Sequence, residues 1–169
     1  MNYNPKIIDF FKKHNMYDKR LFEYLQANST MIDNNDEEQR SFIGCFYLLD
    51  KNDKLIKLQL CLPYVSDYKT ALISIHEITH GIENYYKLGH KFKKDITIEA
   101  LPLLYEKLYI LENPTEELIS YGIYLDSLIM IESEKEYKFA LQIREELLKK
   151  YNKDMQKSIK LIKKISRKY

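Results

Sequence analysis

The chain has 169 residues, with 27 Lys and Arg against 25 Asp and Glu, and a net charge of +2. This near balance predicts no nucleic-acid partner, and the length favours one domain that can bury a sizeable core. The longest apolar run, residues 42–49, is far shorter than the roughly 20 residues that a membrane-spanning helix needs. We expect a cytoplasmic protein, since the first residues lack the apolar core of a signal peptide and Cys45 and Cys61 form no disulfide framework.

The first 62 residues predict short helices followed by a β-hairpin. Residues 5–28 carry apolar side chains spaced as in one or two short helices, and the polar segment 28–41 is typical of a loop. Segments 42–49 and 54–62 flank a polar turn, which indicates two paired strands. The second segment alternates apolar and polar residues, which indicates a half-buried strand with these residues on its buried face: Ile56, Leu58, Leu60 and Leu62.

A helix of roughly 20 residues is predicted after this hairpin. Ser66 and Asp67 are residue types that cap helix N-termini, an apolar-rich stretch follows, and Gly89 is a typical C-terminal stop. Within the helix, the chain reads His76-Glu77-Ile-Thr-His80.

His76 and His80 are four residues apart, so on a helix both imidazoles lie on one face. Two rings in this arrangement can bind one Zn²⁺ at about 2.0–2.1 Å. Glu77 then stands beside the pair, positioned to take a proton from a zinc-bound water. This is the HExxH pattern of zinc hydrolases, and it outweighs the alternative of two histidines with only local contacts.

A catalytic zinc needs a third protein ligand, and four downstream residues offer one: His90, Asp95, Glu99 and Glu106. His90 follows the predicted helix stop too closely, and Asp95 is expected to cap the next helix. Glu99 opens a second predicted helix, 99–112, that has room to return against the first. Glu106 lies two turns further on the same face and suits the role of orienting a histidine ligand.

These features resemble a known family. HExxH followed by a glutamate on a second helix is the gluzincin arrangement, and the spacing from Glu99 to Glu106 is similar to that of thimet oligopeptidase and oligoendopeptidase F. Residues 121–127, Tyr-Gly-Ile-Tyr-Leu-Asp-Ser, are similar to a tyrosine segment of that family. The resemblance implies that Tyr124, and secondarily Tyr121, donates a hydrogen bond to the oxyanion of the reaction. The chain is far smaller than family members and would be a minimal catalytic core.

The remainder of the chain is predicted to be helical. Pro114 and Thr115 begin one helix, and residues 135–169 carry apolar residues at a spacing of four, beginning at Phe139 and ending at Ile159. The same segment is rich in lysine. A solvated helix surface explains this better than nucleic-acid binding does.

The sequence therefore predicts an α+β, mainly α, single domain over residues 1–169. N-terminal helices and a hairpin (1–65, with the hairpin at about 42–62) pack on the HExxH and glutamate helices (66–112), and a helical bundle (115–169) follows. The predicted function is a zinc metallopeptidase that acts on a peptide or protein substrate. His76, His80 and Glu99 bind Zn²⁺, and Glu77 is the general base. The alternatives are a non-catalytic binding or regulatory protein of the same fold and a zinc hydrolase of a non-peptide amide.

Overall fold

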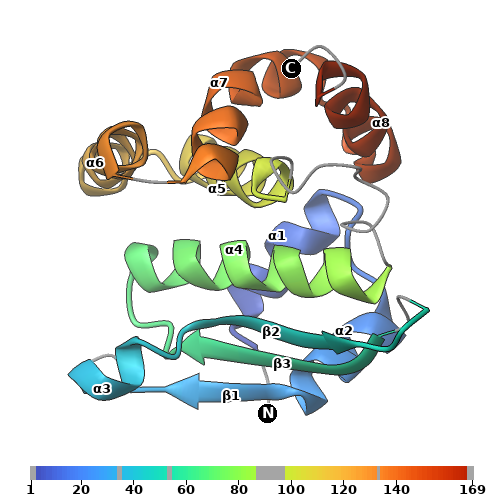
Figure 1. Cartoon of the computed structure of the whole chain (residues 1–169). Coiled ribbons are helices and arrows are strands. Elements are labelled where there is room, and N and C mark those ends of the chain that lie inside the picture. Colours follow the sequence, from blue (N-terminus) through green and yellow to red (C-terminus); the bar gives the residue numbers. More distant parts are fainter. Residues whose placement is uncertain (1–2, 34–35, 53–54, 87–97, 133, 167–169) are drawn as a thin grey trace. The chain divides into compact units, whose positions relative to one another are not determined.

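The computed structural model describes residues 3–33, 36–52, 55–86, 98–132 and 134–166, and it confirms the α+β, mainly α class. The chain divides into two compact units, Met1–His90 and Lys91–Tyr169. Figure 1 shows a small sheet with helices in the first unit and helices alone among the described residues of the second. No helix within the described ranges is long and apolar enough to cross a membrane.

The sheet of the first unit has three described strands, β1 (Ser29–Ile32), β2 (Gly44–Leu49) and β3 (Leu55–Pro63). Their order is β1-β3-β2, with β1 parallel and β2 antiparallel to the central β3. The predicted hairpin is confirmed as the β2–β3 pair, and it leaves β2 as an edge strand of the described sheet.

The prediction of a loop over residues 28–41 was wrong. This segment contains β1 and a short helix, α3 (Glu37–Arg40), which Asp36 caps by accepting hydrogen bonds from two backbone N–H groups. A four-residue strand has little pattern of its own, and β1 is held by its parallel pairing with β3, which sequence spacing does not reveal.

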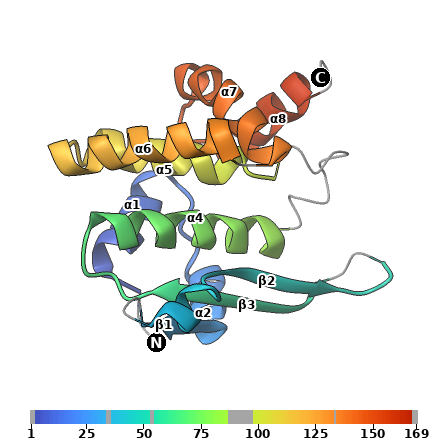
Figure 2. The same ribbon diagram turned by 60° about the vertical axis from the view of Figure 1, so that its left-hand side comes forward.

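The alternation predicted for β3 is confirmed for Leu58, Leu60 and Leu62, which are at most 2% exposed. Ile56 is instead 61% exposed, so its predicted burial was wrong. Ile56 is the second residue of β3, and Figure 2 shows the start of β3 extending beyond the end of the helix that covers the sheet. A correct alternation buries a side chain only where a neighbouring element covers it.

That covering helix is α4 (Tyr68–Tyr85), which packs on β3 and β2. Asp67 caps it, because its carboxylate accepts from the Thr70 N–H while the Thr70 hydroxyl accepts from the Asp67 N–H. Asp67 is therefore confirmed as the cap, and Gly89, the predicted stop, lies outside the described residues.

Gly81 lies where α4 closely approaches the side chains beneath it. A Cβ atom at this position would lie 3.1 Å from Leu25 and 3.2 Å from Leu60. Leu25 belongs to α2 (Lys19–Ala27), which packs on α4 as does α1 (Pro5–Lys13). Because Gly81 has no side chain, α4 can pack this closely against Leu25 and Leu60.

The second unit contains α5 (Ala100–Glu112), α6 (Glu116–Glu132), α7 (Lys135–Lys150) and α8 (Met155–Ser166). Helix α5 is its core element and packs on the other three. The segment 135–169 was predicted to carry one continuous apolar stripe, but the helix breaks after Lys150, and Lys153 has a φ of 58°. Phe139, Ile143 and Leu147 are buried on α7, whereas Ile159 is buried on the separate helix α8.

Candidate metal centre

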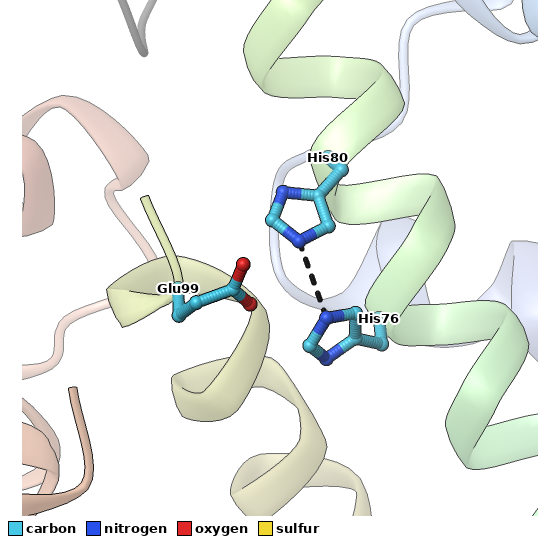
Figure 3. Close-up of side chains that lie close together, drawn as sticks. All are labelled: His76, His80 and Glu99. Atoms are coloured by element: carbon cyan, nitrogen blue, oxygen red, sulfur yellow. Dashed lines mark hydrogen bonds between the residues drawn. The ribbon is translucent and has the colours of Figure 1, made fainter. Parts of the chain in front are cut away.

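The motif histidines lie on one face of α4, with His76 at the centre of the helix and His80 one turn further on. His76 is 8% exposed, and the side chain of His80 is 12% exposed. Their Nε2 atoms lie 3.2 Å apart and point toward the same space, as Figure 3 shows. The helix therefore gives both rings the common orientation that the spacing of four residues predicts.

The distance between these nitrogens fits a shared metal ion. Two ligands at 2.0–2.1 Å from a tetrahedral zinc are about 3.3–3.4 Å apart. Neutral imidazoles also form a hydrogen bond near 3.2 Å, with one ring as donor and the other as acceptor. The two Nε2 atoms are thus already as far apart as two ligands of one zinc ion, so the backbone of α4 would not have to move for both to bind it.

Glu83 contacts the opposite side of the His80 ring. Its Oε2 atom lies 3.3 Å from His80 Nδ1, and the carboxylate side chain is only 4% exposed. A carboxylate beside Nδ1 favours the tautomer in which that nitrogen carries the proton, and in that tautomer the lone pair of Nε2 faces His76. One ring nitrogen of His80 therefore faces Glu83, and the other faces His76.

Glu77 lies one residue after His76 on α4 and is half-buried. It is close to Cys45 of β2: burial, followed by the Glu77 charge, raises the pKa of the Cys45 thiol to about 12. The catalytic carboxylate proposed from the sequence is thus on the side of α4 that faces the edge strand.

Asn84 links the same two elements. Its Nδ2 atom donates to the backbone carbonyl of His80 at 2.9 Å and lies 3.7 Å from Cys45 Sγ. Both cysteines are free thiols of intermediate burial, as the sequence predicted.

Glu99 is the residue immediately before α5, in the second unit, and is 9% exposed. One of its carboxylate oxygens and one ring nitrogen from each of His76 and His80 lie within 4.8 Å of one another (Figure 3). No other group of three His, Cys, Asp or Glu side chains within the described ranges meets this condition. Pro102 lies in the first turn of α5, a position at which a helix tolerates proline.

The other sequence-based ligand candidates have different positions. His90 and Asp95 lie outside the described residues. Glu106 is half-buried on α5, two turns beyond Glu99. The role of Glu106 in orienting a histidine ligand stays a prediction, whereas Glu83 of the first unit contacts His80 directly.

Tyr121 and Tyr124 lie on α6 with their rings stacked at 6.4 Å. Tyr124 is 57% exposed. The role of these tyrosines as oxyanion donors remains a prediction that rests on the resemblance of residues 121–127.

Sequence reasoning missed three residues around the motif: Glu83, Asn84 and Cys45. Glu83 stands three residues after His80, and on a helix that spacing is a usable signal for a contact between the two side chains. Cys45 and Asn84 are 39 residues apart and meet through packing of α4 on β2, for which the sequence offers no local signal.

Comparisons with protein families, with curated proteins and with solved structures find no match to this chain.

Proposed function

We propose that the chain is a zinc-dependent peptidase in which His76, His80 and Glu99 bind the metal and Glu77 is the general base. The observation that carries the proposal is the 3.2 Å separation of the His76 and His80 Nε2 atoms on α4. That distance, with a glutamate directly after the first histidine, is the geometry that the HExxH chemistry requires.

Zinc suits this donor set better than the harder cations do. Two imidazole nitrogens and a carboxylate form a catalytic zinc set that leaves a fourth position for water or substrate, whereas Mg²⁺ and Ca²⁺ prefer oxygen ligands. The proximity of a Glu99 oxygen to both ring nitrogens supports Glu99 as the third ligand.

Each of these residues would have a separate role in peptide hydrolysis. A zinc ion held by this set polarises the scissile carbonyl and makes a bound water more acidic. The Glu77 carboxylate accepts the proton of the attacking water and delivers it to the leaving amine. The hydroxyl of Tyr124, or of Tyr121, donates a hydrogen bond to the oxygen that gains negative charge.

The edge strand β2 supports a peptide as the substrate. Within the described sheet β2 pairs on one side only, and three of its apolar side chains are exposed: Phe46, Tyr47 and Leu48. An exposed apolar edge strand tends to pair with another extended chain. A substrate strand that pairs with β2 would explain why the apolar side chains of this edge are exposed. Main-chain pairing with β2 would hold a peptide of any sequence beside the helix that bears Glu77.

Metal analysis of the purified protein, combined with peptide hydrolysis, tests this proposal. We expect about one zinc per chain and cleavage of unstructured peptides that a chelator abolishes and zinc restores. His76→Ala and Glu99→Ala should lose the metal, whereas His90→Ala, which removes another ligand candidate, should retain it. A wild-type protein that binds no zinc contradicts the proposal, and a protein that binds zinc but cleaves no peptide contradicts its enzymatic part.

A further inference from the structure

The contact between Glu83 and His80 has a consequence for the strength of the metal site. His80 Nδ1 lies 3.3 Å from Glu83 Oε2, and both side chains are almost wholly removed from solvent, at 12% and 4% exposure. Glu83 is three residues after His80, and side chains on a helix lean toward its N-terminus, so Glu83 reaches back over the ring.

A carboxylate on the far nitrogen changes what the near nitrogen can do. It fixes the proton on Nδ1 and the ring orientation, and it makes Nε2 a stronger base toward a metal. Without an acceptor, the ring of His80 can rotate or shift its proton to Nε2, and both changes remove the ligand lone pair.

The burial of Glu83 also favours a cation at this place. A carboxylate that leaves water loses a large part of its hydration free energy, and a hydrogen bond from a neutral imidazole compensates only part of that loss. A divalent ion on His80 Nε2 draws electron density from the ring, which makes Nδ1–H a stronger donor. The buried carboxylate is therefore better compensated when the ion is bound.

We propose that Glu83 is a positioning residue of the metal centre, which acts through His80 to raise the affinity of the site for zinc. This inference rests on the proposed zinc site. It goes beyond that proposal because it assigns a role in metal affinity to Glu83, a residue that neither binds the ion nor takes part in proton transfer.

The test compares the zinc affinity of four proteins: wild type, Glu83→Gln, Glu83→Ala and Glu37→Gln. Glu37→Gln is the matched control, because it removes one negative charge from the same unit at a side chain that is 93% exposed. Affinity is measured by competition with a chromophoric chelator, and folding is followed by circular dichroism with the metal removed.

We expect Glu83→Ala to bind zinc roughly 10–100-fold more weakly than wild type. Glu83→Gln keeps an acceptor oxygen without the charge and should fall between the two, which is the partial rescue that a positioning role predicts. The absorption spectrum of bound Co²⁺ should also shift in both Glu83 variants. Glu37→Gln should match wild type in affinity and spectrum.

The outcomes separate this inference from the proposed function. Wild type that binds no zinc overturns both. Wild type that binds zinc, with folded Glu83 variants within twofold of its affinity, overturns the inference and leaves the zinc site standing. If Glu83→Ala does not fold, the nearly isosteric Glu83→Gln decides by the same twofold criterion.

Discussion

Asn84 Nδ2 lies 3.7 Å from Cys45 Sγ, so a buried amide on the histidine helix contacts a thiol on the edge strand. The same amide donates to the backbone carbonyl of His80, one turn before it on α4. The contact therefore joins β2, the strand proposed to hold substrate, to the turn of α4 that presents a metal ligand. In the proposed enzyme, these two side chains would link the strand that holds the substrate to the helix turn that holds the metal.

Cys45 is expected to be unreactive toward alkylating reagents. Burial, with the neighbouring Glu77 charge, raises the pKa of its thiol to about 12, so at pH 8 its thiolate fraction is about 10³-fold below that of an ordinary cysteine. Mass spectrometry of iodoacetamide-treated native protein should show Cys61 modified well before Cys45. Equal rates at the two thiols would show that Cys45 is not buried against α4.

The same shift predicts a dependence of stability on pH. The folded-state pKa of Cys45 lies above its unfolded value, so the folded protein retains a proton that the unfolded chain loses. Its contribution is fully present below about pH 8.5 and declines as the pH rises toward 12. Urea unfolding of wild type and Cys45→Ala between pH 7 and pH 10.5 should show this decline in wild type and a flatter profile in the variant.

Replacing Glu77 by Gln should abolish hydrolysis and leave zinc binding unchanged. The amide is nearly isosteric but does not accept the proton of the attacking water, so turnover should fall by roughly 10²–10⁴-fold. Steady-state cleavage of a fluorogenic peptide and zinc content measured on the same sample provide the check. A variant as active as wild type would rule out the general-base role.

Tyr124→Phe should lower turnover about 10²–10³-fold if its hydroxyl stabilises the oxyanion. The substitution removes one exposed oxygen from α6, so zinc content and thermal stability should not change. Tyr64→Phe is a suitable control, because it removes a hydroxyl from a tyrosine of similar exposure, 59%, in the loop after β3. Tyr121→Phe shows which of the two stacked tyrosines is the donor, and wild-type rates in both variants would contradict the role.

The second unit should depend strongly on one buried ion pair. Arg144 on α7, with its side chain 8% exposed, donates two hydrogen bonds to Asp126 on α6, at 2.7 and 2.6 Å. Asp126→Ala leaves a buried guanidinium without this carboxylate and should cost about 2–4 kcal/mol, given that Asp126 is one-third exposed.

Thermal unfolding with a matched control checks this expectation. Glu146→Ala removes the acidic partner of Lys150 from an exposed pair on α7 and should cost less than about 1 kcal/mol. Replacing both Arg144 and Asp126 with apolar residues should recover much of the loss, since no unpaired charge then remains buried. Equal effects of Asp126→Ala and Glu146→Ala would show that the Arg144 pair contributes no more than a surface contact.

The part of the site that could be predicted from sequence is the part set by local geometry. The spacing of His76 and His80 fixes their common face on any helix, and Asp67 marks where that helix begins. The alternation in residues 54–62 likewise identifies β3, because a strand with one buried face repeats every two residues.

The parts that sequence missed depend on contacts between distant segments or on side-chain direction. Strand β1 exists through its pairing with β3, and Cys45 approaches Asn84 through the packing of α4 on the sheet. Glu83 was visible at a favourable spacing, but the spacing alone does not say which ring nitrogen it contacts. The apolar spacing of four residues continues across the break after Lys150, so periodicity did not reveal that α7 ends there.

Gly81 directly follows His80, and its effect extends beyond packing. A methyl group here would meet Leu25 and Leu60 at 3.1 and 3.2 Å, so those side chains or the helix would have to give by a few tenths of an ångström. Displacement of α4 would carry His80 with it and widen the gap between the histidine face and β2. If His80 binds the metal and β2 holds the substrate, as proposed, then the Leu25 and Leu60 side chains beneath Gly81 help to set the distance between metal ligand and substrate, and one added methyl group would change that distance.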